Sequence, residues 1–301
     1  MSAVSRSLPQ EMCFPSILHE PRTAKDDTEP ILPTKHGTKG IEYNKTENTM
    51  HDAEINIQVL RHNVNAATAA LAAGLMLNED AAEALLWTLQ SKASQAHVTL
   101  QQEEQRLREE GLTGEMEDDA CFYLKRSYEG LPVKAFYIQG TICEKSNPLV
   151  FALPFVITPT RTSSLYEAGD ILASICAVAL FNLGLSRHTQ SFVSKKLEEQ
   201  TDLLEQAKEL YTQSLNLLDQ LKSLTPEGTL IQVFLANCNN LVEVYSKLGQ
   251  DEESASWQET LCQSFWTVPP ARSSPTYRHF LNASECYRIE VSPMMDIAMD
   301  D

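Results

Sequence analysis

The sequence predicts a mainly α fold of antiparallel helix pairs with a small β-hairpin insertion, and two observations carry this prediction. Apolar residues recur at spacings of three and four over long stretches, which is the period of one helix face. Glycine and proline are concentrated between these stretches, where they end helices and begin turns. With 43% hydrophobic and 22% charged residues in a chain of 301, the composition is that of a globular protein with a sizeable core.

The N-terminal third predicts a tail followed by a first helix pair. Residues 1–49 contain several prolines and no sustained apolar period, which predicts a disordered tail. Residues 50–118 predict a helical hairpin, because apolar residues keep the helical spacing on both sides of a break near Gly74. We expect Gly74 to supply a left-handed turn and Asn78 to cap the second helix.

A segment of different character follows at 119–164. Its runs 133–138 and 149–157 are rich in β-branched and aromatic residues, and the turn residues 146–148 separate them. This pattern predicts a loop and a β-hairpin insertion. Because Pro154 has no N–H to donate, part of the second run is expected to be an edge or an irregular segment.

Residues 165–266 predict two further helix pairs. The apolar run Ile171–Leu185 is shorter than the roughly 20 residues that span a bilayer and contains Asn182, so we interpret it as a buried helix. A long amphipathic helix is expected next, with Ser194 as its N-cap. The turn residues 225–228 then separate it from the last pair.

The final segment, 267–301, begins with prolines that end the helical region, since proline cannot continue a helix. Phe280-Leu281 and residues 287–289 predict a short terminal strand. The remaining residues predict an acidic tail.

Charge and cysteine usage exclude several kinds of function. The formal net charge is -17, from 41 Asp and Glu against 24 Lys and Arg. A field of this sign repels phosphate backbones and anionic membranes and attracts a basic partner segment. The N-terminus has no long apolar run, and the 7 cysteines lack the close spacing of zinc ligands. We therefore expect an intracellular protein, cytoplasmic or nuclear, with reduced thiols, no metal or other cofactor, and no nucleic-acid or membrane partner.

The three predicted helix pairs share an arrangement of small and large residues. Small residues let two helices approach closely, and large ones fill the space between them. The shared positions are Leu180-x2-Leu183-Gly184-x2-Arg187 with Ala207-x3-Tyr211; Cys238-x2-Leu241-Val242-x2-Tyr245 with Ser254 or Ala255; and Asn63-x2-Ala66-Ala67-x2-Ala70 with Ala81-x3-Leu85.

This arrangement resembles the tetratricopeptide-like (TPR) helical repeats, including the kinesin light chain variety and divergent forms predicted in unicellular algae. The equivalent positions Ala67, Gly184 and Val242 are 117 and 58 residues apart. Tandem repeats of this type recur about every 34 residues, so the spacing departs from a regular superhelix. The resemblance implies stacked helix pairs in a scaffold or interaction module that binds a peptide or protein partner in a helical groove, rather than an enzyme.

Asparagine stands two positions before the small residue in each first helix, at Asn65, Asn182 and Asn240. In peptide-binding members of the family, asparagines on the first helices satisfy the backbone of an extended peptide, so the resemblance implies that these three bind one. The alternative is that they bond to a neighbouring helix or loop and only fix packing. Arg61 and Arg187 are further candidates, because a guanidinium can bind a carboxylate.

Catalytic chemistry is the second hypothesis. The sequence contains no hydrolase elbow, phosphate-binding loop or kinase motif, and His188 is interpreted as a partner of a helix dipole. The 130–160 insertion is not explained by repeats, however, and an enzyme or small-molecule sensor could have its site where this segment meets the helices. Arg126, Tyr137 and Glu144 are then the polar groups of interest.

Overall fold

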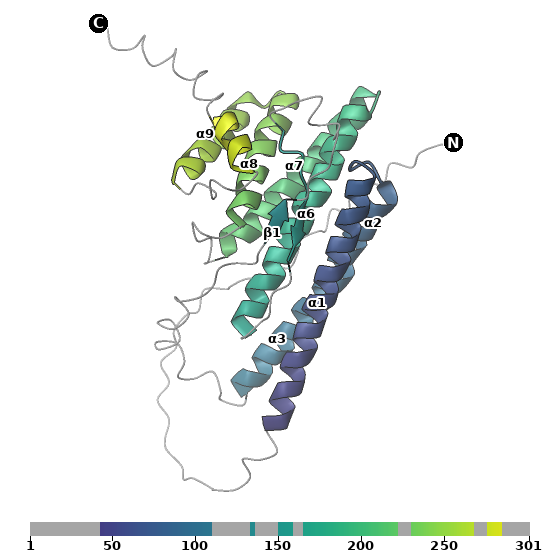
Figure 1. Ribbon diagram of the computed structural model, residues 1–301, viewed down its shortest axis with the longest axis vertical. Helices are drawn as coiled ribbons and strands as arrows, with labels where there is room; N and C mark the ends of the chain where they lie inside the picture. The colour runs from purple at the N-terminus through teal and green to yellow at the C-terminus, as the bar shows by residue number, and fades with distance from the viewer. Residues whose placement is uncertain are drawn as a thin grey trace, which may run out of the picture. The chain divides into compact units, whose positions relative to one another are not determined.

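The computed structural model confirms a mainly α protein with one small antiparallel sheet (Figure 1). The chain divides into two units, Met1–Thr49 and Met50–Asp301, and the second contains nearly all the described residues. The structure describes residues 43–109, 133–135, 150–158, 165–221, 230–267 and 276–284. Outside the described residues lie most of the predicted tail, the loop after residue 109, Arg126, Tyr137, Glu144, the predicted turns at 146–148 and 225–228, and residues 285–301.

The first helix, α1 (Tyr43–Ala73), begins within the segment that the sequence predicts as a tail. The last proline of this segment is Pro33 and its last glycine is Gly40, so neither residue type interrupts the helix that begins at Tyr43. Three consecutive helical elements follow: α2 (Glu79–Thr88), the π-helical turn η1 (Leu89–Ala93) and α3 (Ser94–Glu109).

The turn between α1 and α2 corrects one prediction and confirms another. The left-handed residues are Leu75 and Met76, with φ of 54° and 65°, and not Gly74. Glycine is needed at 74 for a different reason, because a Cβ there would lie 2.8 Å from the Cβ of Asn78. The Asn78 side chain accepts a hydrogen bond of 3.1 Å from the backbone N–H of Ala81, which confirms it as the cap of α2.

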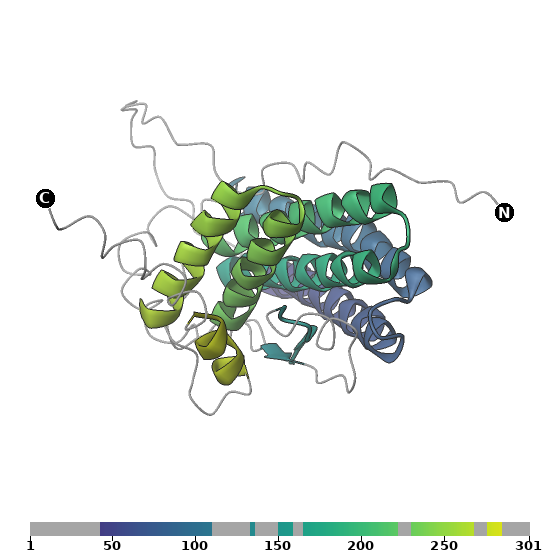
Figure 2. The ribbon, with the colours of Figure 1, turned by 90° about the horizontal axis from the view of Figure 1, so that it is seen from above.

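The remaining helices surround a central one, α6 (Leu165–Val193), which contacts α2, α3, α7, α8 and β2. By length and composition this helix could cross a membrane, but 89% of its apolar window is buried inside the protein, as expected for a buried core helix. The helices after it are α7 (Leu197–Gln220), α8 (Leu230–Lys247), α9 (Asp251–Thr267) and a helix at 276–284. In Figures 1 and 2, α7 lies alongside α6.

Small residues lie where neighbouring helices touch. On α6, Gly184 faces α7, and a Cβ at this position would lie 2.8 Å from the ring of Tyr211. Ser214 on α7 donates a hydrogen bond of 2.8 Å to the carbonyl of Ala177 on α6. Between α8 and α9, Ser254 donates one of 2.9 Å to the carbonyl of Val242. These contacts give close helix approach in the second and third predicted pairs.

Two predictions for the C-terminal half are wrong. Lys196, without a side-chain hydrogen bond, is the N-cap of α7, whereas the predicted cap Ser194 lies before it. Phe280 and Leu281 belong to a helix instead of a strand. The side chain of Phe280, which suggested a strand, is fully buried from this helix. Tertiary burial here outweighs the local preference of aromatic residues for strands.

The sheet consists of β1 (Val133–Ala135) and β2 (Phe155–Ile157), paired antiparallel with Val133 opposite Ile157. The predicted antiparallel pairing is thus present between β1 and β2, and Val150 and Phe151 are not part of the sheet. Pro154 directly precedes β2, where its missing N–H interrupts no pairing. Figure 2 shows these strands (teal) on one side of the helices.

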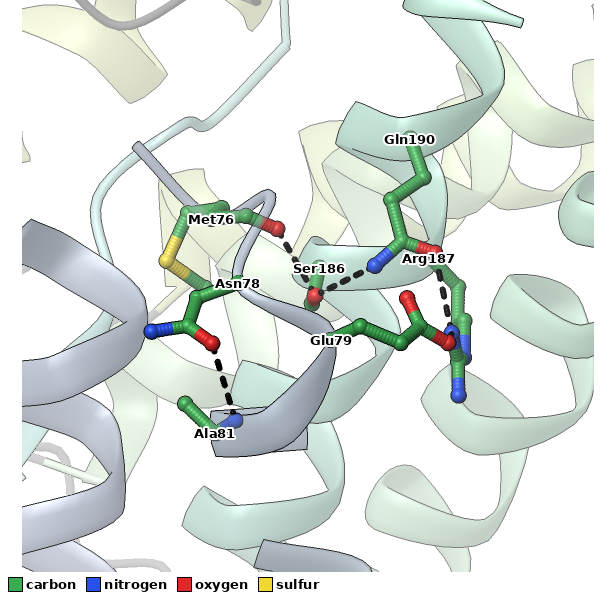
Figure 3. A network of polar contacts seen from close by, with 7 residues as sticks. All are labelled: Met76, Asn78, Glu79, Ala81, Ser186, Arg187 and Gln190. Atoms are coloured by element: carbon green, nitrogen blue, oxygen red, sulfur yellow. Dashed lines mark hydrogen bonds and ion pairs between the residues drawn. The ribbon is translucent and has the colours of Figure 1, made fainter. Parts of the chain in front are cut away.

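The C-terminal part of α6 holds the α1–α2 turn (Figure 3). The hydroxyl of Ser186 donates a hydrogen bond of 2.7 Å to the carbonyl of Met76. Arg187 forms an ion pair of 2.8 Å with Glu79 and a second contact of 2.9 Å with Gln190. The first helix pair is therefore tied to the second through the strained turn.

The close approach of α6 to α7 can be tested with two alanine substitutions in the same helix. Gly184→Ala is expected to lower the free energy of unfolding by about 2 kcal/mol, because the new Cβ overpacks the ring of Tyr211. Gly169→Ala, where a Cβ meets nothing within 4 Å, should raise it by about 0.5–1 kcal/mol. Urea unfolding measures both, and equal effects would contradict the contact.

Candidate functional site: an asparagine ladder

The three asparagines singled out in the sequence hold one segment of the chain itself, residues 150–158, which contains β2. Asn240 on α8 accepts a hydrogen bond of 2.8 Å from the N–H of Phe151 and donates one of 3.0 Å to its carbonyl. We call Asn65, Asn182 and Asn240, with these backbone contacts, the asparagine ladder.

The other two members repeat this geometry. Asn182 on α6 accepts from the N–H of Phe155 at 2.9 Å and donates to its carbonyl at 2.8 Å. Asn65 on α1 accepts from the N–H of Ile157 at 2.9 Å and donates to its carbonyl at 2.7 Å. Three helices distant in sequence therefore contact one short segment in the same way.

The ladder uses the chemistry of the carboxamide. A carboxamide offers one acceptor and an NH2 donor, so it matches the N–H and C=O of a single extended residue. In a strand these groups point to alternate edges from one residue to the next, so Phe155 and Ile157 of β2 present the same edge, whereas Phe151 lies before the strand. Asn182 and Asn65 thus occupy the edge of β2 where another strand would pair, while β1 pairs with the opposite edge.

Aromatic packing holds the side chains of the segment. The ring of Phe151 stacks on Phe155 at 5.4 Å and on Phe280 at 5.2 Å. Phe155 in turn packs against Phe181 of α6, with ring centroids 5.2 Å apart. Each of these four rings is fully buried or nearly so. The 276–284 helix and α6 therefore enclose the segment on its apolar side.

Buried hydroxyl groups accept further hydrogen bonds from Asn182 and Asn240 and fix the orientation of their side chains. Asn182 donates a second hydrogen bond, of 3.0 Å, to the hydroxyl of Thr68 on α1. Asn240 contacts the hydroxyl of Tyr211 at 3.1 Å, and this hydroxyl lies 3.4 Å from Nδ1 of His188. The tyrosine that packs on Gly184 is thus also the one that supports Asn240.

His188 does not act as a partner of a helix terminus, because α6 continues to Val193 and the imidazole is fully buried. It stacks on Phe192 with ring centroids 5.2 Å apart. Burial, and to a lesser degree the charge of Lys247, lowers the pKa of His188 from 6.5 to about 3. The imidazole is therefore neutral at physiological pH and serves as a fixed support for Tyr211.

The arginines predicted with the asparagines are placed differently. Arg187 binds Glu79 of its own chain, in the contact shown in Figure 3. Arg61 is half-buried on α1, one turn before Asn65. The structure therefore joins the three asparagines at one segment and leaves Arg187 in a contact between helix pairs. Binding of a partner by any of these residues stays a prediction.

Sequence reasoning missed the occupant of the ladder and the residues that support it. The segment 150–158 was predicted only as part of a hairpin, and Tyr211 only as a packing residue. A usable signal for Tyr211 was its place four residues after the small residue Ala207 in the pattern shared by the helix pairs, where a large side chain is expected to fill the space between two helices. No comparable signal exists for Thr68 or for the aromatic partner Phe280, because their contacts join distant parts of the sequence.

Comparisons with protein-family models, curated proteins and solved structures found no match to this chain. In the part of the chain that the structure describes, no three His, Cys, Asp or Glu side chains are grouped closely enough to hold a metal ion.

The ladder can be tested by removing one carboxamide. Asn182→Ala should lower the free energy of unfolding by about 3 kcal/mol, because the N–H and C=O of Phe155 lose their buried partner. Asn63→Ala, at a half-buried position on α1, is the matched control and should change it by less than about 0.5 kcal/mol. Urea unfolding and hydrogen exchange at the Phe155 amide measure the effect; unchanged exchange in Asn182→Ala would contradict the contact.

The buried imidazole predicts a specific pH dependence. The unfolded chain binds a proton at His188 near pH 6.5, whereas the folded chain does so only near its lowered pKa of about 3. The stability that the neutral ring contributes is complete above pH 6.5 and is lost as the pH falls toward 3, at about 1.4 kcal/mol per pH unit.

We expect His188→Gln to lack this slope. The carboxylates contribute equally to the pH dependence of the variant and of the unmodified chain. Their contribution therefore cancels when the two free energies of unfolding are subtracted at each pH. Parallel stability curves for the variant and the unmodified chain between pH 6.5 and pH 4 would show that His188 is not buried in its neutral form.

Proposed function

We propose that this chain is a non-catalytic interaction module of TPR-like helix pairs that binds an extended segment of a protein in the groove lined by Asn65, Asn182 and Asn240. The observation that supports this most is that each asparagine bonds both backbone groups of one residue, at distances between 2.7 and 3.0 Å. Such hydrogen bonds recognise the backbone of a bound peptide, and contacts with the side chains of that peptide then determine which sequences bind.

The spacing of the ladder also supports a peptide site. Phe155 and Ile157 present the same edge of β2, and Phe151, just before the strand, gives both of its backbone groups to Asn240, so one peptide that follows the path of residues 151–157 can satisfy all three asparagines. The asparagines contact these residues in the order α8, α6, α1, which is the reverse of their order in the sequence. A protein segment in extended form is the ligand class that meets this requirement.

Charge and thiol chemistry support the proposed partner and compartment. A net charge of -17 attracts a partner with basic residues beside the bound segment. Cys176 and Cys238 are buried free thiols, and burial raises the pKa of Cys176 to about 12. Such thiols stay protonated and inert, which suits a protein of the cytoplasm or nucleus.

A peptide library tests the proposal. The purified full chain is titrated with fluorescent ten-residue peptides of varied sequence, and binding is followed by anisotropy. At least one peptide class should bind, and Asn65→Ala should weaken it by about tenfold, because two hydrogen bonds to its backbone are lost.

Asn63→Ala is again the control, two residues away on the same helix, and it should leave the dissociation constant unchanged. Binding that is equally strong in Asn65→Ala would separate peptide recognition from the ladder. The absence of any bound peptide would remove the proposed function.

A further inference from the structure

The asparagine ladder is already occupied, because residues 150–157 of the same chain lie in it. We propose, resting on the function proposed above, that this segment is an internal ligand, and that the partner is an extended protein segment of the same pattern that displaces it. The pattern is an aromatic residue at the position of Phe151, a second at Phe155 and a β-branched aliphatic residue at Ile157.

The backbone contacts allow such an exchange without loss. Each carboxamide bonds the N–H and C=O of its residue and reads no side chain, so an incoming extended peptide replaces the six hydrogen bonds one for one. The edge of β1 that pairs with β2 can pair with the incoming segment in the same way, as in other cases of strand addition.

The side chains of the internal segment define what the partner must carry. The ring of Phe151 occupies a site between Phe280 and Phe181, at centroid distances of 5.2 and 6.2 Å. The ring of Phe155 packs on Phe181 at 5.2 Å, and Ile157 is 2% exposed opposite Val133. These three positions form deep apolar sites that a peptide with small or charged residues there would leave unfilled.

Other positions of the segment impose less. Leu153 and Val156 are half-buried, so several side chains fit at them. Pro154 is buried and has no N–H, so this position demands no hydrogen-bond acceptor from the groove. Ala152 is also buried, so its position admits only a small residue. The pattern is thus an aromatic residue, a small residue, one variable residue, proline, an aromatic residue, one variable residue and a β-branched aliphatic residue.

Tethering makes the internal segment a regulator of partner binding. A segment joined to α6 through residues 158–164 competes at an effective concentration in the millimolar range, so a partner binds the unmodified chain weakly. A substitution that weakens the internal segment should therefore strengthen partner binding. A segment that only completes the core gives the opposite result, because its loss damages the site.

The experiment uses the peptide with the sequence of residues 149–158, flanked by lysines for solubility and labelled with a fluorophore. It is titrated into the full-length chain, into Phe155→Ala and into Ile157→Ala, whose smaller truncation serves if Phe155→Ala unfolds. Phe155→Ala should bind the peptide at least about tenfold more tightly than the unmodified chain. Adding Asn65→Ala to Phe155→Ala should remove this gain.

Thermal unfolding gives a second readout for variants that are destabilised but still folded at low temperature. At a peptide concentration of about ten times its dissociation constant, the melting temperature of either variant should rise by about 3 °C. A control peptide with alanine in place of both phenylalanines and the same lysine flanks should give no rise.

The outcomes separate this inference from the function on which it rests. If peptides of unrelated sequence bind as tightly as the matching one, yet still need Asn65, the internal-ligand pattern is overturned and the peptide-binding function stands. If Phe155→Ala and Ile157→Ala bind no more tightly than the unmodified chain and gain no thermal stability from the matching peptide, the inference is overturned. If no peptide binds any folded form, both are overturned.

Discussion

The described structure depends on one constraint, the need to satisfy a buried carboxamide. Asn182 and Asn240 are fully buried, where an unsatisfied polar group costs about 1–3 kcal/mol. An extended backbone residue meets this need with both of its hydrogen-bonding groups, and the buried amide and carbonyl of Phe151 and Phe155 need the asparagines equally. The segment and the helices therefore become stable together, because each would bury unpaired polar groups without the other.

Helix periodicity made most of the fold predictable, and the failures have identifiable physical causes. The predicted helices, the buried character of α6 and the cap at Asn78 follow from local spacing and local hydrogen bonds. The left-handed turn at Leu75 and Met76 does not, because it is stabilised by burial of Met76 and by a contact with Ser186 far along the chain. Local propensity favours glycine in such a turn, but here tertiary contacts hold Leu75 and Met76 in the left-handed conformation.

The candidate site was predictable in its helices and not in its occupant. The three asparagines share a position relative to the small residue of their helix, and that regularity can be read from one sequence. Their partners lie 89, 27 and 92 residues away, and no local pattern encodes these pairings. The apolar residues of 150–158 indicated a strand, but alternation alone does not say whether its free edge meets another strand or a row of side chains.

The contacts behind the ladder leave little room for change at Gly184 of α6. Gly184 admits the ring of Tyr211, whose hydroxyl reaches both Asn240 and the neutral imidazole of His188. Through these contacts with Gly184, Asn240 and His188, the side chain of Tyr211 connects the α6–α7 packing to the α8 end of the groove. A shift of α7 against α6 would move Tyr211 and with it the support of Asn240. Helix packing and the geometry that holds an extended segment are therefore one property of this protein rather than two.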